Sequence, residues 1–172
     1  MDLPEAFANE SAELARALKA HAGGRATKRG NYHLTLAFLG EIDEADCERA
    51  IGAAECACRE ASPLLLESGE LGSFGRRSLA TLWLGIRLTP QLEELVARLR
   101  AELSARGVPF DNKQFKAHIT LVRKARAPKG SLPNLPFPRD AIATHITLFN
   151  SVLTQDGPIY KPLYSIDLSG KE

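Results

Sequence analysis

The chain has 172 residues, enough to bury one sizeable hydrophobic core, and this length predicts a single domain over residues 1–172. Charged residues make up 25% of the chain and apolar residues 44%, and the 22 lysines and arginines exceed the acidic residues by one, so net charge alone favours neither a nucleic acid nor a membrane partner. No run approaches 18 apolar residues and the start, MDLPEAFANE, lacks signal-peptide character, so we predict a cytoplasmic protein with no membrane partner.

Apolar spacing predicts a helix, a strand and a second helix in the first third of the chain. Residues 3–20 have helical spacing, and the glycine pair at 23–24 ends that helix. Residues 32–40, YHLTLAFLG, alternate as a strand does, which turns Leu34, Leu36 and Phe38 towards the helices. The second helix is expected from Asp43, a good N-cap, to about Ala61.

The rest of the chain adds strands, one helix and a long loop. Thr89 and Pro90 are expected to begin an amphipathic helix that ends at Gly107. A proline-rich loop is predicted over 127–138. The predicted strands cover residues 62–74, 78–88, 116–122, 141–153 and 159–168, with the turn-rich GSFGRRS between the first two and TQDGP between the last two. Together these elements predict an α+β protein.

The three cysteines lie in one alanine-rich stretch that is predicted to be helical. Because Cys56 and Cys58 are separated by a single residue, they lie on different sides of that helix, and Cys47 stands more than two turns before them. Such spacing suits neither a disulfide nor a shared metal ion, so we expect small, reduced, partly buried side chains.

A His-x-Thr-Leu tetrad occurs three times, at residues 33–36, 118–121 and 145–148. Side chains at alternate positions of a strand share a face, so His33 and Thr35 point one way, as do His118 and Thr120. The first two tetrads lie in different halves of the chain, each with at least one helix, which indicates a duplicated unit. If the halves meet about a pseudo-twofold axis, two imidazoles and two hydroxyls converge on one cleft.

Basic residues flank these two tetrads. Residues 16–29 contain five lysines and arginines and residues 113–129 contain six, and neither stretch has an acidic residue. This favours a phosphate substrate. Arg123 is the best candidate for a phosphate contact because guanidinium matches phosphate oxygens bidentately. In strict alternation Arg123 faces away from His118, so this assignment requires the strand to end or twist at Val122.

Two histidines and two hydroxyl donors, without a set of carboxylate or thiolate ligands, fit phosphoryl transfer that needs no metal ion. One imidazole activates water and the other protonates the departing oxygen, while the threonine hydroxyls donate to the oxyanion. A cyclic phosphodiester on adjacent ribose hydroxyls is a natural substrate because its strained ring lowers the barrier.

NYHLTLAFLGEID and FKAHITLVR resemble the paired His-x-Thr motifs of the 2H phosphoesterases, and most closely those of the RNA 2′,3′-cyclic phosphodiesterases, once named 2′-5′ RNA ligases. The likeness extends over nearly the whole chain. DLPEAF resembles the family's start, LGSFGRRSLATLWLGI its central hairpin, and LFNSVLTQDGPIYKPLYSI its C-terminal hairpin.

The resemblance implies a bilobal fold, two pseudo-symmetric lobes of antiparallel sheet and helices around a central cleft. It implies hydrolysis of an RNA or nucleotide 2′,3′-cyclic phosphate to a 2′-phosphate, without metal or other cofactor. His33 would be the proton donor and His118 the proton acceptor. Thr35, Thr120 and Arg123 would bind the phosphate. No obligate protein partner is evident.

Two departures from the family pattern concern structure more than chemistry. Members usually have an apolar strand before DLP, whereas this chain starts almost at DLP, and Ala117 replaces the usual proline before the second histidine. A base-stacking aromatic residue is expected near the cleft, with Phe115, Tyr32 and Phe74 as unranked candidates.

His145 begins the third tetrad but lacks a basic flank and falls in the C-terminal hairpin, so we predict a non-catalytic, solvent-exposed or edge-strand histidine. Three alternatives stay open. A non-catalytic RNA-binding module would use the same basic cleft, and a 2′-5′ RNA ligase would use every residue named above. A zinc hydrolase is less favoured because no third ligand is spaced suitably from either His33 or His118.

Overall fold

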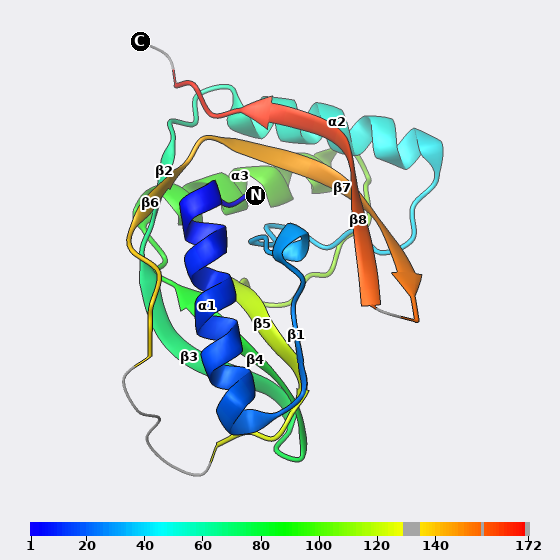
Figure 1. The fold of residues 1–172 in the computed structure, drawn as a ribbon. Coiled ribbons are helices and arrows are strands. Elements are labelled where there is room, and N and C mark those ends of the chain that lie inside the picture. The colour runs from blue at the N-terminus through cyan, green and yellow to red at the C-terminus, as the bar shows by residue number, and fades with distance from the viewer. Residues whose placement is uncertain (129–134, 156, 171–172) are drawn as a thin grey trace.

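The structure is a computed structural model that describes residues 1–128, 135–155 and 157–170 (Figure 1). It confirms the α+β class. In chain order the elements are α1 Glu5–Ala22, β1 Arg25–Ala26, the 3-10 turn η1 Arg29–Asn31, α2 Glu44–Cys58, β2 Leu64–Leu66, β3 Ser68–Arg76, β4 Leu79–Ile86, α3 Pro90–Ala105, β5 His118–Ala125, β6 Ala141–Ala143, β7 His145–Thr154 and β8 Gly157–Asp167. None of these helices is long and apolar enough to cross a membrane.

The helices begin and end at the predicted signals. Asp43 caps α2 by accepting a hydrogen bond from the Asp46 amide at 2.7 Å, and Thr89 caps α3 by accepting from the Leu92 amide at 3.3 Å. Gly23 ends α1 in a left-handed conformation, with φ of 64°. Each helix buries one stripe, and the fully buried leucines of α1 and α3 form much of the core.

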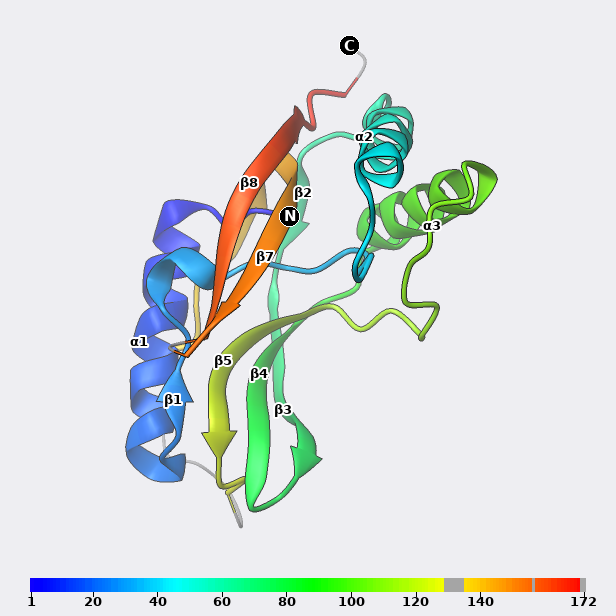
Figure 2. The same cartoon turned by 90° about the vertical axis from the view of Figure 1, so that its right-hand side faces the viewer.

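The strands form antiparallel sheets in two lobes. One sheet has the order β1-β5-β4-β3, and α1 packs on its β5 and β1 strands. The other lobe contains the β7–β8 hairpin with α2, which packs on β8 and on α3 (Figure 2). The short β2–β6 pair connects the two lobes, because β2 leads into β3 and β6 leads into β7. The lobes are intertwined, because α1 precedes the first tetrad but covers the sheet that contains the second.

The prediction of a strand over residues 32–40 is wrong. Only His33 pairs in a β-bridge, with Asp2, supported by hydrogen bonds of 3.1 and 2.9 Å between the Leu34 and Met1 backbones. A bridge of one pair does not make a ladder. Alternation persists without it for Leu34 and Leu36, which are buried, but it fails at Phe38, which is 63% exposed.

Two other predicted strands are each split where the chain changes sheets. Residues 62–74 divide at Glu67 into β2, which pairs with β6, and β3, which pairs with β4. Residues 141–153 divide at Thr144 into β6 and β7 for the same reason. Of the predicted proline-rich loop, residues 129–134 lie outside the described residues, as does Asp156 in the predicted TQDGP turn.

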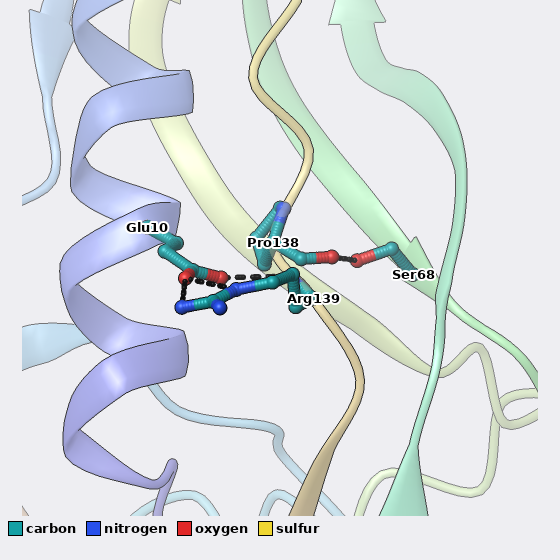
Figure 3. Close-up of polar contacts among 4 residues, drawn as sticks. All are labelled: Glu10, Ser68, Pro138 and Arg139. Atoms are coloured by element: carbon teal, nitrogen blue, oxygen red, sulfur yellow. Dashed lines mark hydrogen bonds and ion pairs between the residues drawn. The ribbon is translucent and has the colours of Figure 1, made fainter.

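The segment before β6 is fastened on both sides (Figure 3). The Arg139 guanidinium donates to the Glu10 carboxylate of α1 at 2.6 and 2.8 Å, and the Arg139 amide donates to the same carboxylate at 2.7 Å. On the other side, the Ser68 hydroxyl donates to the Pro138 carbonyl at 2.9 Å. These contacts hold the connection between α1 and β3.

Trp83 requires a glycine opposite it on β3. A Cβ atom at Gly72 would lie 2.1 Å from the indole ring of Trp83, so the ring rests on the bare backbone. We expect Gly72→Ala to lower the free energy of unfolding by about 1–3 kcal/mol through overpacking. Chemical denaturation followed by the emission of Trp83, the single tryptophan, measures this.

Gly30→Ala is the matched control, since a Cβ there meets no atom within 4 Å. We expect it to change the free energy of unfolding by less than about 0.5 kcal/mol. Equal stability of the two variants would contradict the packing described for Trp83.

Candidate functional site

One pocket lies between the four-stranded sheet and the tip of the β7–β8 hairpin. It is lined by all five residues that the sequence analysis selected: His33, Thr35, His118, Thr120 and Arg123. The two His-x-Thr pairs therefore come together from different lobes, as the duplicated unit predicts.

Both imidazole rings are oriented by a hydrogen bond to a backbone carbonyl. Nδ1 of His33 is 2.9 Å from the Asn31 carbonyl oxygen, and Nδ1 of His118 is 2.7 Å from that of Lys116. A carbonyl oxygen only accepts, so each Nδ1 carries the hydrogen and donates it. In the neutral ring Nε2 is then free of hydrogen and available to exchange a proton in the pocket.

A bulge in β5 brings Arg123 to the pocket. The register shifts between the pairs Leu82↔Val122 and Trp83↔Thr120, and the neighbours Leu121 and Val122 are both buried. Alternation is therefore broken just before Arg123, which reverses the side-chain order at that point. A second register shift, between the pairs Leu82↔Val122 and Ala80↔Ala125, follows it. The first shift is the twist at Val122 that the assignment of Arg123 required.

His33 is covered by aromatic rings of the hairpin. The Tyr160 ring meets it edge-on with a centroid separation of 4.5 Å, and the Phe149 ring lies 6.4 Å away. Burial lowers the pKa of His33 below its usual value, and the charge of Arg123 adds to this effect, while the hydrogen bond to the Asn31 carbonyl opposes it. Because the unfolded chain binds this proton more tightly, the free energy of unfolding falls as the pH drops below about 6.5.

His118 has a different aromatic neighbourhood. The Phe74 ring contacts it edge-on at 5.0 Å and the Trp83 ring lies at 5.9 Å. The ammonium of Lys116 stands 4.5 Å from the centroid of Trp83 and 5.5 Å from that of Phe74. This flank of the site carries an added positive charge beside the imidazole.

Only one of the three aromatic candidates lies beside a histidine of the pocket. Tyr32 is buried, and Phe115 packs against the core, so neither reaches the pocket. Phe74 adjoins His118 and is 38% exposed. Sequence reasoning missed Tyr160, which lines the pocket. The signal was present in the sequence GPIY at residues 157–160 of the hairpin, but no local pattern placed that hairpin against His33.

The basic flank before the first tetrad also reaches the pocket, through Arg25 and Lys28. His145 does not. Its Nε2 lies 3.8 Å from the Asp2 carboxylate, and its Nδ1 is 3.1 Å from the Thr144 hydroxyl. Its place on β7 of a two-stranded sheet agrees with the predicted edge-strand histidine. Within the described residues, no group of three or more His, Cys, Asp or Glu side chains is arranged to hold a metal ion.

Comparison with known proteins identifies the family. A profile of the LigT like phosphoesterases matches residues 1–83 and 86–160. A Thermotoga maritima protein named RNA 2′,3′-cyclic phosphodiesterase is 33% identical over 179 residues, covering 99% of this chain and 94% of that protein. The Escherichia coli protein of the same name is 33% identical over 141 residues, covering 81% and 77%. The chain belongs to the LigT-like phosphoesterases.

Solved structures agree with this assignment. A crystal structure from Thermus thermophilus superposes with a TM-score of 0.82 at 25% identity, covering 99% of this chain and 96% of the other. Escherichia coli LigT complexed with 3′-AMP gives 0.76 at 29% identity, covering 98% and 94%. The predicted 2H phosphoesterase fold and the expectation that this LigT-like protein is an enzyme are both confirmed.

Tyr160 is expected to set the pKa of His33 by keeping water away from it. In wild-type protein the ring-proton resonance of His33, identified by its loss in His33→Gln, should titrate below about pH 6.5. Tyr160→Ala admits water, so the midpoint should rise towards the usual value. Proton NMR over a pH series measures both midpoints.

Tyr164→Ala provides the control from the same strand, because the Tyr164 hydroxyl donates to Glu55 of α2 at 2.5 Å and Tyr164 does not line the pocket. A His33 midpoint that is the same in wild type and Tyr160→Ala would show that the hairpin does not desolvate the imidazole.

Proposed function

We propose that this LigT-like phosphoesterase hydrolyses RNA 2′,3′-cyclic phosphate ends to 2′-phosphates without a metal ion. The observation that carries the proposal is the meeting of two His-x-Thr pairs and Arg123 in one pocket, with both rings oriented by backbone carbonyls. The printed names of the Thermotoga maritima and Escherichia coli relatives support the same activity. A cytoplasmic location stays a prediction from the sequence.

In the proposed reaction, Nε2 of His118 accepts a proton from water as the water oxygen bonds to phosphorus. The bond between phosphorus and the 3′ oxygen breaks, and His33 gives its proton to that oxygen. The bond to the 2′ oxygen remains, so the product is a 2′-phosphate. The hydroxyls of Thr35 and Thr120 and the guanidinium of Arg123 donate to the non-bridging oxygens, where charge accumulates.

The division of roles has an electrostatic basis. A proton donor must be charged before the reaction, yet burial lowers the pKa of His33 in the free enzyme. The anionic phosphate bound beside the ring favours the imidazolium and raises that pKa again. Substrate binding would therefore charge the donor at the moment it is needed.

The alternatives differ in what they require of the imidazoles. A non-catalytic RNA-binding module needs the positive charge but not two Nε2 atoms in one pocket. A 2′-5′ RNA ligase uses the same groups, with a nucleoside 5′-hydroxyl replacing water, so an assay of both directions separates the two. A zinc hydrolase would be inhibited by a chelator.

Loss of either imidazole should strongly reduce turnover. With chelator present and an RNA ending in a 2′,3′-cyclic phosphate as substrate, we expect His33→Ala and His118→Ala each to lower kcat by roughly 10²–10⁴-fold. His145→Ala should retain wild-type kcat because His145 lies outside the pocket. Equal losses at all three positions, or no turnover by wild type, would contradict the proposal.

The two threonines should act through their hydroxyls. Thr35→Val and Thr120→Val keep side-chain volume but remove a donor to an anion, so kcat/KM should fall by roughly 10–100-fold. Thr147→Val, in the third tetrad, is the matched control, because its hydroxyl donates to Asp2 at 2.6 Å rather than into the pocket. Steady-state kinetics on the same RNA would contradict the phosphate-binding role if all three variants behaved alike.

A further inference from the structure

Basic and acidic residues occupy different segments of this chain, although the net charge is close to zero. Residues 14–40, 71–92 and 112–139 contain 15 of the 22 lysines and arginines and no aspartate or glutamate. These segments include β1, the β3–β4 turn and β5, which belong to one sheet. The cations of these three elements are therefore gathered in space as well as in sequence.

Four of these cations lie together at the closed end of the β3–β4 hairpin, and we call them the basic end: Arg76, Arg77, Lys124 and Arg126. The pair Arg76↔Leu79 closes the hairpin, and the adjacent pair Ala80↔Ala125 places Lys124 and Arg126 beside it. The Ala127 amide donates to the Arg77 carbonyl at 2.8 Å, which joins the two segments. All four side chains are exposed.

The basic end carries charge that the described part of the protein does not neutralise. The ion pairs among the described residues use other cations, such as Arg29 with Glu5, Arg139 with Glu10 and Lys113 with Asp111. The Arg77 guanidinium donates to the carbonyl oxygens of Ala127 and Pro128, which are neutral. Repulsion among uncompensated charges destabilises the folded state, so a polyanionic ligand is the occupant that this surface fits.

The basic end continues directly from the pocket. Arg25 and Arg123, which line the pocket, are paired with each other across β1 and β5, and Lys124 follows Arg123. From His118 to Ala125, β5 spans about 23 Å at roughly 3.3 Å per residue. A mononucleotide bound at the two imidazoles does not reach the far end, whereas an RNA strand does.

We propose that the basic end binds the phosphates upstream of the reactive terminus, so that the preferred substrate is the end of an RNA strand rather than a free cyclic nucleotide. This inference rests on the proposed function for the identity of the reactive end. Each nucleotide added on the 5′ side should strengthen binding until the strand passes the basic end.

The test compares two substrates and two triple variants. The substrates are adenosine 2′,3′-cyclic monophosphate and an eight-nucleotide RNA with the same terminus. The first variant is Arg76→Gln with Lys124→Gln and Arg126→Gln. The control is Arg49→Gln with Arg59→Gln and Arg87→Gln. It removes equal charge from α2, from the residue that follows α2, and from the residue that follows β4 at the end remote from the β3–β4 turn. None of these six residues lines the pocket.

In wild type and control at low salt, KM should be lower for the RNA than for the mononucleotide. The first variant should raise KM for the RNA roughly tenfold and leave mononucleotide turnover unchanged. Fluorescence anisotropy measures the binding of an eight-nucleotide RNA that ends in a 2′-phosphate. In a plot of log binding constant against log salt concentration, the first variant should have a slope smaller in magnitude by about 2 than that of wild type, at about 0.7 per cation removed.

Equal KM values for the two substrates in wild type, or equal losses in both triple variants, would overturn the inference. The proposed function fails separately. If neither substrate is hydrolysed but the RNA binds with a salt slope that only the first variant reduces, the basic end is an RNA-binding surface on a protein with another activity.

Discussion

The pairing of β5 with β1 on one side and β4 on the other is the constraint on which the site depends. This one strand carries His118, Thr120 and Arg123. β4 pairs with it at His118 and Thr120, and β1 adds a second paired edge at Val122 and Arg123, which leaves the backbone there little freedom. Two-sided pairing also tolerates the bulge at Leu121 and Val122, since the flanking pairs hold the strand on either side of it. An edge strand with the same sequence could slip in register and would lose Arg123 from the pocket.

The two histidines are alike in orientation and unlike in surroundings. Each donates from Nδ1 to the carbonyl of the second residue before it, a contact within the local backbone of each segment. Their neighbours come from different lobes, hairpin aromatics over His33 and Phe74 with Lys116 beside His118. The shared motif thus accounts for the shared orientation of the rings, whereas the different packing gives them different surroundings, in keeping with the different roles proposed for them.

Much of this architecture could be predicted because the relevant signals are local. Asp43 and Thr89 cap the helices they were expected to cap, and the site residues were predicted from periodicity, flanking charge and family resemblance together. The predictions that were wrong or incomplete depend on contacts between segments that are distant in the sequence. The sequence of residues 32–40 alternates as a strand does, but the segment makes only one isolated β-bridge. The splits at Glu67 and Thr144 occur where one extended segment pairs in two sheets. Tyr160 reaches His33 only through tertiary packing between opposite ends of the sequence.

Net charge is a poor guide to the partner of this chain, and the reason is physical. A total of +1 is compatible with a surface on which charges of opposite sign alternate and with one on which they are separated. The field near a surface depends on the arrangement within about one Debye length, roughly 8–10 Å, rather than on the total. Here many carboxylates lie on or beside the helices, where they pair with nearby arginines, and the segments that form the basic end contain none. Charge counted by segment, and then placed by strand register, is therefore what indicates the direction in which a polyanion would leave the pocket.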